Sequence, residues 1–133
     1  MTHLYTFKKH EKLKSRKLID RLFSEGKKKF SHPLKLVYLI EPKPLNIDDW
    51  PLLFSVSVSK KKFKSAAKRN LIKRRIREAY RLNKAELQKK IQEKNTISLS
   101  LMFIYIEKEA YSFDQIEPSV KKILKHLLNE IDR

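Results

Sequence analysis

The feature that most constrains the fold is a helical segment, residues 68–81 (KRNLIKRRIREAYR), whose two sides have opposite character. With about 3.6 residues per turn, an α-helix brings Ile72, Ile76, Ala79 and Tyr80 onto one stripe. An apolar stripe of this kind, which Leu87 would continue, packs against a protein core. Any fold for this chain must therefore bury one side of the helix and leave the other side open.

The open side of the same helix repels itself. Arg69, Lys73, Arg77 and Arg81 are spaced four apart, and each like-charge pair at that spacing costs roughly 0.2–0.5 kcal/mol. The only acid of the segment, Glu78, falls beyond the edge of this side. Bound phosphates would remove the repulsion, whereas a solvated surface helix would leave it uncompensated.

Positive charge is concentrated around this helix. Residues 60–84 hold twelve Lys or Arg and one acid, a net +11 of the chain's formal +17. An imbalance of this size attracts polyanions, nucleic acid first and acidic membrane surfaces second. The helical spacing also places Lys84 on the polar side. We predict that nucleic acid binds through Lys60, Lys61, Lys64, Arg69, Asn70, Lys73, Arg74, Arg77 and Arg81.

The residues before the basic helix predict one helix followed by strands. The helix begins after Ser15 as its N-cap, and Gly26 is expected to end it in the left-handed conformation. Residues 34–40 alternate as a strand with Leu34, Leu36, Tyr38 and Ile40 on one side, and residues 52–58 alternate more cleanly. Residues 43–51 (KPLNIDDWP) predict a connecting loop, and the number of strands between residues 29 and 59 stays open.

The basic helix is expected to run over about residues 65–91, followed by a buried strand within residues 96–107 and a last helix. The last helix has a capping-box pattern at residues 112–115 (SFDQ). Pro118 favours a regular helix that begins only at that proline. Together these elements predict an α+β fold, a small sandwich with helices covering one face of a sheet. Residues 1–14 are expected to form a basic flexible arm and residues 15–133 a single domain.

The composition excludes several kinds of site. The chain has 133 residues, of which 41% are hydrophobic, which is enough for one modest core. It has no cysteine, its single glycine cannot build a phosphate-binding loop, and its four histidines lack metal-ligand spacing. No apolar run approaches the roughly 20 residues that span a bilayer, and the N-terminus has no apolar signal core. We therefore expect a cytoplasmic chain with no membrane partner.

The order of the elements favours RNA over DNA as the ligand. A reader of the DNA major groove uses a compact pair of helices, but this basic helix lies between strands. RNA-binding proteins pair basic surfaces with aromatic side chains on a sheet. Ile19, Phe23 and Tyr38 could line such a groove, although their spacing, taken singly, is more typical of core residues.

At KRNLIKRRIRE, preceded by FSVSVSKK, the chain resembles the protein subunit of bacterial ribonuclease P, from about Lys12 to Leu128. The family signature is Arg-Asn-Arg, one residue, Lys-Arg, two residues, Arg. Leu71 stands where the family usually has arginine, at a position outside the basic side of the helix. The resemblance implies a fold like ribosomal protein S5 domain 2, with a left-handed strand–helix–strand crossover. The signature falls on Arg69, Asn70, Leu71, Lys73, Arg74 and Arg77.

The resemblance also implies a function. In this family the catalyst is an RNA that uses Mg²⁺ to cut the 5′ leader from precursor tRNA, so the protein itself would have no catalytic residue and no metal ligand. The protein would bind the catalytic RNA through the basic helix, as a monomer with one copy per RNA. It would hold the leader between the first helix and the sheet, in a groove formed by Ile19, Phe23, Tyr38, Ser57 and Lys60.

Two other functions stay open at this point. A ribosomal or general structured-RNA-binding protein would share the fold and the charge, but would have no role in tRNA cleavage. A metal-dependent nuclease would cut RNA without a partner, although no acids cluster near the basic helix to hold its metals. In the family reading, Ile19 stands where phenylalanine is usual.

Overall fold

The computed structural model describes residues 11–42 and 51–132 of the chain. The predicted loop at residues 43–50 and the first ten residues of the predicted arm lie outside these ranges. The helices and strands are α1 (Arg16–Glu25), β1 (Lys27–Ser31), β2 (Leu34–Pro42), β3 (Leu52–Val58), α2 (Ala66–Asn83), α3 (Ala85–Lys94), β4 (Ile97–Tyr105) and α4 (Phe113–Ile131).

The described strands form one four-stranded sheet in the order β1-β2-β4-β3. The pairs β1–β2 and β2–β4 are antiparallel, and β3 pairs with β4 in parallel. The parallel pair requires a crossover, which α2 and α3 supply. The α+β fold is confirmed, while the left hand of the crossover stays a prediction.

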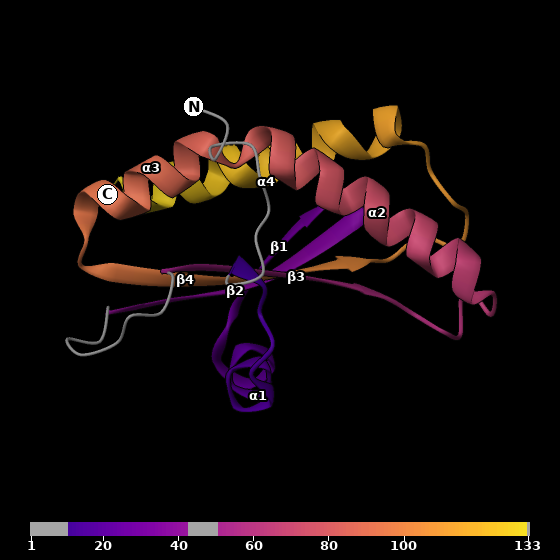
Figure 1. Cartoon of the computed structure of the whole chain (residues 1–133), viewed down its shortest axis with the longest axis horizontal. Coiled ribbons are helices and arrows are strands. Elements are labelled where there is room, and N and C mark those ends of the chain that lie inside the picture. The colour runs from indigo at the N-terminus through magenta and orange to yellow at the C-terminus, as the bar shows by residue number, and fades with distance from the viewer. Residues whose placement is uncertain (1–10, 43–50, 133) are drawn as a thin grey trace.

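Helices cover both faces of the sheet, not one as predicted. Figure 1 shows α2, α3 and α4 together on one side, with α1 alone on the other. The main core lies under the three helices, and the predicted stripe of α2 is fully buried there together with Leu87. Phe54 of β3 stacks on Tyr80 of α2, with ring centroids 4.0 Å apart. A smaller core under α1 contains Leu13, Leu22, Val37 and Met102.

Local signals explain most element ends. The Ser15 hydroxyl accepts a hydrogen bond from the backbone of Leu18, which confirms the predicted N-cap of α1. The prediction for Gly26 is wrong, because its φ of −72° is an extended conformation. A side chain there would instead lie 2.3 Å from the Leu22 carbonyl oxygen and 2.9 Å from that of Tyr38. Glycine is therefore required by close packing between α1 and β2.

The structure answers one point that the sequence left open and differs from two further expectations. Strand β1 (KKKFS) has no apolar alternation, and its backbone pairing with β2 forms it instead. The long helix is two helices, because the chain breaks at Lys84, whose side chain is fully buried rather than on the polar side. Helix α4 begins at Phe113 and contains Pro118, because the complete capping box of Ser112 and Gln115 fixes its first turn.

Residues 11–14, which we name the strap, belong to the folded body and not to a flexible arm. The Leu13 amide donates to the Phe54 carbonyl oxygen at 2.8 Å, and Leu13 is buried. Glu11 is also buried, and its carboxylate pairs with the Lys84 ammonium. The strap thus joins the edge of β3 to the break between α2 and α3. No helix within the described ranges is long and apolar enough to cross a membrane.

The buried pair of Glu11 and Lys84 gives the first prediction. Glu11→Ala should lower the free energy of unfolding by about 3–5 kcal/mol, because it leaves the Lys84 ammonium buried without this carboxylate. Urea denaturation measures the change. The double variant Glu11→Leu, Lys84→Met should recover most of the loss, since an apolar pair has no charge to desolvate. A single variant that unfolds at the wild-type urea concentration would contradict the assignment.

Candidate nucleic-acid interface

The turn between β3 and α2 presents four lysines to solvent, of which Lys62 donates to the Ile106 carbonyl oxygen. Phe63 lies buried beneath the turn, and its amide donates to the Ser59 carbonyl oxygen at 3.1 Å. This anchoring leaves Lys60, Lys61 and Lys64 exposed, as the sequence predicts. The amino end of α2 follows directly and has no acid in its first turn. Its backbone amides add to the local attraction for anions.

The side of α2 away from the core is positively charged, and we name it the basic face: Asn70, Lys73, Arg74, Arg77 and Arg81. Asn70, Arg74 and Arg77 are exposed, and Lys73 is half-buried. Among the residues that the structure describes, none of these four side chains makes an ion pair or a hydrogen bond. The helix therefore holds two guanidinium groups, one ammonium and one amide ready for a ligand.

Arg69 and Arg81 are the first and last of the four cations spaced four apart, and both have partners within the protein. The Arg69 guanidinium donates to the carbonyl oxygens of Phe63 and Lys64 at 2.7 and 3.0 Å, which closes the preceding turn. The Arg81 guanidinium pairs with Glu78 at 2.5 Å. This pairing lowers the pKa of Glu78 and raises that of Arg81. The one acid of the helix thus lies off the basic face but still neutralises the last arginine.

A second surface lies on the sheet face that carries α1. Cross-strand neighbours project from the same face of a sheet. The register aligns Phe30 of β1 with Lys35 of β2, Lys35 with Ile104 of β4, and Ile104 with Ser57 of β3. These four residues, which we name the transverse row, cross all four strands. None is buried, because α1 and the strap cover the next rows of the sheet instead.

Four of the five predicted groove residues lie either on α1 or at the end of β3. Ile19 packs in the smaller core from α1, half-buried, and Phe23 on the same helix is 51% exposed. Ser57 belongs to the transverse row, and Lys60 follows the end of its strand. A leader groove between α1 and the sheet stays a prediction, in which Ile19 and Phe23 would form one side and the transverse row the floor.

Tyr38 does not belong to this groove. Its side chain lies on the opposite face, is 3% exposed and packs in the main core. Its hydroxyl donates to Glu130 of α4 at 2.5 Å, and Lys27 pairs with the same carboxylate. Burial opposes ionisation of Glu130, but these two partners prevail and lower its pKa. The prediction failed because Tyr38 alternates in step with the core residues Leu34 and Leu36.

The strap connects the groove to the basic face. A small hollow of about 150 Å³ is lined by Lys12 and Lys14 of the strap, Ser55 of β3 and Arg77 of α2. No carboxylate lines it. Three cations from two distant segments therefore lie around one hydroxyl at this place, and an anion fits better here than any other ligand.

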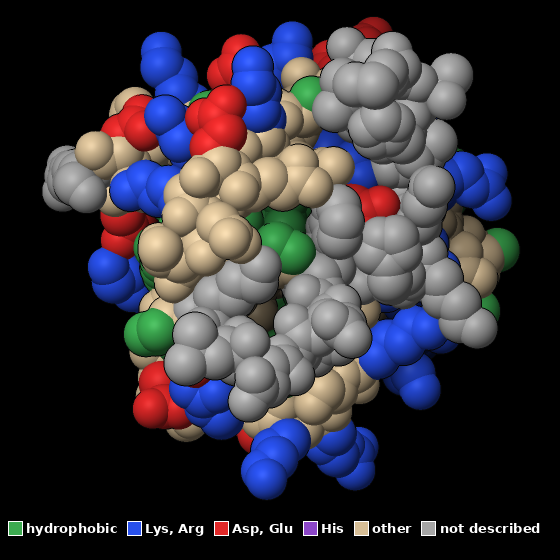
Figure 2. All heavy atoms as spheres, turned by 60° about the vertical axis from the view of Figure 1, so that its left-hand side comes forward, with side chains coloured by type: hydrophobic (Ala, Val, Ile, Leu, Met, Phe, Trp, Pro, Cys, Tyr) green, Lys and Arg blue, Asp and Glu red, His purple; other side chains and the backbone are tan. Residues whose placement is uncertain are grey.

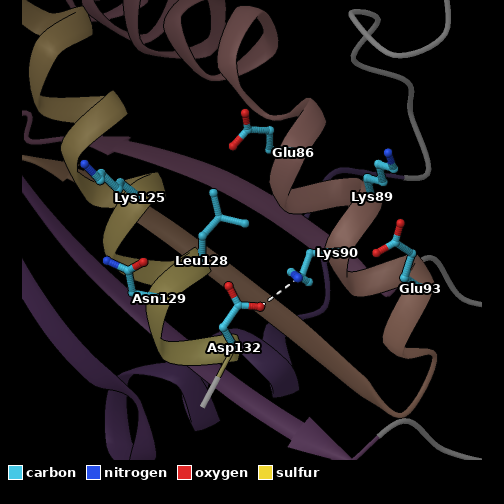
Figure 3. A pocket seen from close by; sticks show the side chains of 8 residues that line it. All are labelled: Glu86, Lys89, Lys90, Glu93, Lys125, Leu128, Asn129 and Asp132. Atoms are coloured by element: carbon cyan, nitrogen blue, oxygen red, sulfur yellow. Dashed lines mark ion pairs between the residues drawn. The ribbon is translucent and has the colours of Figure 1, made fainter.

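The hollows around α3 lack this uniform charge. The end of the molecule that carries α3 shows Lys or Arg beside Asp or Glu side chains (Figure 2). A hollow there, between α3 and α4, is lined by Glu86, Glu93 and Asp132 as well as by lysines (Figure 3). Lys90 pairs with Asp132 across it at 2.7 Å. These carboxylates would repel phosphate, so polyanion binding belongs to the other surfaces.

The described residues contain no group of three or more His, Cys, Asp or Glu side chains placed to hold a metal ion. The basic face can neutralise phosphates, and the groove can hold an extended strand. Sequence reasoning missed Phe30, Lys35 and Ile104 because the pairing register alone places them beside Ser57. The lone lysine within the apolar strand 34–40 was the only available signal.

Comparison with known proteins connects this arrangement to one family. A family model described as Ribonuclease P matches residues 7–128. The chain is 36% identical to the ribonuclease P protein component of Porphyromonas gingivalis, over 98% of this chain and 94% of that protein. It is 30% identical to that of Chlorobium phaeobacteroides, over 94% of this chain and 90% of that protein.

A solved structure shares the fold. The RNase P protein of Staphylococcus aureus superposes with a TM-score of 0.61 at 23% identity, covering 88% of this chain and 94% of that one. Its mutant with defective mRNA degradation activity gives a TM-score of 0.63, with coverage of 90% and 89%. At this identity the likeness supports the fold alone.

The basic face gives the second prediction. Arg74→Ala or Arg77→Ala should weaken binding of structured RNA by about 1–3 kcal/mol, because each variant loses a charge-assisted contact. Each should also reduce the salt dependence of the binding constant by about one phosphate contact. Titration of labelled RNA at several salt concentrations measures both. Lys89→Ala, an exposed lysine on α3, is the matched control, and unchanged affinity in both arginine variants would refute the assignment.

The position of Tyr38 gives the third prediction. Tyr38→Phe should lower the free energy of unfolding by about 1.5–3 kcal/mol, because a hydrogen bond to a charged partner is lost. Binding of RNA should stay at the wild-type level, since the hydroxyl faces α4. Urea denaturation and RNA titration of the same preparation separate the two effects. Weaker RNA binding with an unchanged free energy of unfolding would instead support Tyr38 as a residue of the leader groove.

Proposed function

We propose a function for this chain from one premise: it belongs to the ribonuclease P protein family. It is thus the protein component of an endoribonuclease. In our proposal the chain binds the catalytic RNA of ribonuclease P and the 5′ leader of precursor tRNA. It thereby assists the Mg²⁺-dependent removal of the leader, which yields the mature 5′ end of tRNA in the cytoplasm.

The observation that carries the proposal is the charge of Lys73, Arg74 and Arg77 on the basic face, with which no acid of the described residues pairs. The buried stripe fixes α2 on the sheet, so its opposite side stays presented to solvent. Lys73, Arg74 and Arg77 repel one another there, and within the described part of the chain no acid pairs with them. Phosphates of a folded RNA supply the missing countercharge without any rearrangement of the protein. We therefore assign the basic face to the catalytic RNA.

The groove beneath α1 suits a single strand. An extended leader can lie across the transverse row, where Ile104 offers apolar contact and Ser57 a hydroxyl. Phe23, half-exposed on α1, can stack on a base. Lys60 at the end of β3 can hold a phosphate. The protein's contribution to cleavage is then positional, because binding the leader fixes the adjoining bond relative to the RNA.

In this proposal the RNA, and not the protein, binds the magnesium ions. The reaction's metal ions would be held mainly by RNA phosphates, and they would supply charge stabilisation at the cut bond. The chain's own residues act before that step, since lysines and arginines reduce the repulsion between two RNAs that must approach. A lower requirement for magnesium in the presence of protein follows from this electrostatic role. We further propose a monomer, with one copy for each catalytic RNA.

Cleavage of precursor tRNA gives the fourth prediction. At low magnesium and moderate salt, the catalytic RNA together with the protein should cut a leader-bearing precursor tRNA at least about tenfold faster than the RNA alone, a gain of about 1.4 kcal/mol. The protein alone should cut nothing. Gel analysis of the released leader measures all three reactions.

The controls separate the competing functions. The double variant Arg74→Ala, Arg77→Ala should lose most of the stimulation, and Lys89→Ala should keep it. Cleavage by the protein alone would support a metal-dependent nuclease. Tight binding to other structured RNA without any stimulation would support a ribosomal or general RNA-binding protein.

A further inference from the structure

We propose that the leader groove continues to the β1 edge of the sheet, where Phe30 and Lys35 form a nucleotide-binding subsite. The inference rests on the proposed function, because it assigns this subsite to the 5′ leader of precursor tRNA. It adds a contact for leader nucleotides farther from the cleavage site than those over Ser57. Its two parts are a stacking surface on Phe30 and a basic hollow beyond it.

The pairing register places Phe30 in the groove. Phe30 lies opposite Lys35 on β2, which lies opposite Ile104 on β4. Its side chain therefore projects from the face that carries α1, in line with Ser57 on the opposite edge strand. Three strand spacings separate β1 from β3, a distance of about 14 Å. A strand of RNA that crosses the row from Ser57 reaches Phe30 without leaving the face.

The environment of Phe30 suits a nucleotide. The ring is 61% exposed, more than any other large hydrophobic side chain of the described residues. The Lys35 ammonium lies 5.6 Å from its centroid, so a base stacked on the ring would have a cation beside it for its phosphate. An exposed phenylalanine on an edge strand also invites aggregation. Lys27 and Lys28 already protect this edge against pairing with another strand. Edge protection therefore does not explain the exposed phenylalanine.

A hollow of about 630 Å³ lies next to the ring. Phe30 borders it, and Lys29 of β1 and Lys122 and Lys125 of α4 line it. No carboxylate is among its lining residues, in contrast to the hollow between α3 and α4. The two histidines of the lining, His32 and His126, each face an acid, which leaves the three lysines to attract phosphate.

The continuity of the surface from Ser57 to the hollow identifies the 5′ leader as the occupant. The basic face of α2 follows β3, whereas the hollow lies beyond β1 at the opposite edge, and the transverse row joins the two sides. Because α4 covers the opposite face of the sheet from α1, a single strand held over Ser57 and Ile104 reaches the three lysines by passing over Phe30 and around the β1 edge. Stacking and phosphate contacts are the means by which proteins bind single strands without reading their sequence. We therefore expect this subsite to respond to leader length more than to leader sequence.

A series of precursor tRNAs, identical except for leaders lengthened one nucleotide at a time, tests the inference with the assembled holoenzyme. For the wild-type protein, affinity should rise with leader length and then level off. With Phe30→Ala the rise should stop at a shorter leader, and long leaders should bind about 5- to 100-fold more weakly than to wild type. Short leaders should bind equally well to both proteins.

Variants of matched chemistry sharpen the result. Phe30→Tyr should restore the wild-type profile, because it keeps the ring, whereas Phe30→Leu should behave like the alanine variant. Lys122→Ala combined with Lys125→Ala should also shorten the responsive length, and Lys89→Ala should not. All these positions are exposed, so thermal unfolding should match wild type and confirm that each variant is folded.

The outcomes separate this inference from the proposed function. Affinity that rises with leader length in wild type and identically in Phe30→Ala would overturn the subsite and leave the leader groove standing. Affinity of the wild-type holoenzyme that ignores leader length would overturn the leader groove itself. A loss in Phe30→Ala that is equal for all leaders, the shortest included, would assign Phe30 to another part of the complex and overturn the subsite.

Discussion

The rest of the structure depends on how α2 is held against the sheet. Its apolar stripe is fully buried, and Phe54 stacks on Tyr80 at 4.0 Å. Each large buried side chain of that stripe contributes about 1.5–3 kcal/mol. Repulsion among the cations on the other side costs roughly 1 kcal/mol in all. Burial therefore prevails several-fold, and the sequence can present uncompensated charge on a helix that stays folded. A helix that relied on its own ion pairs would have had to place acids on the basic face.

The strap and α1 give the opposite face of the sheet its use. Leu13 and the apolar side of α1 cover the rows of the sheet that need burial, and they leave the transverse row only partly covered, with Ile104 in contact with the smaller core. The transverse row contains side chains of four different characters: aromatic, cationic, aliphatic and hydroxyl. Because the Glu11 carboxylate pairs with Lys84, the same strap that closes the smaller core is tied to the end of α2. Damage to that buried pair would then disturb both surfaces together, even though neither residue touches the solvent.

The α2 stripe, the Ser15 cap, the strand at residues 52–58 and the capping box at Ser112 could all be predicted, because each depends on neighbours in the chain. The failures involve partners distant in sequence. Lys84 reads as a surface cation until Glu11 is folded against it, and β1 forms only because β2 is there to pair with. Of the candidate site, periodicity alone identified the basic face. Tyr38 was assigned to the groove as an aromatic side chain on a strand and again by resemblance, but a one-residue difference in strand position moves a side chain to the other face. Phe30 and Lys35 were missed for the same reason.

The two surfaces meet at the end of β3, and this junction explains how a protein that only binds could direct a cut. Ser57 belongs to the transverse row, and after two more residues the chain reaches Lys60 and the turn that leads into α2. The turn is fixed internally, by buried Phe63 and by the Arg69 guanidinium on its carbonyl oxygens. In the proposed complex, a folded RNA on the basic face and a single strand in the groove would be held at a separation set by a few rigid residues. Flexible lysines could provide the same affinity, but they could not provide that fixed separation. For an RNA catalyst, the position of the leader relative to its own backbone is the quantity that decides which bond is cut.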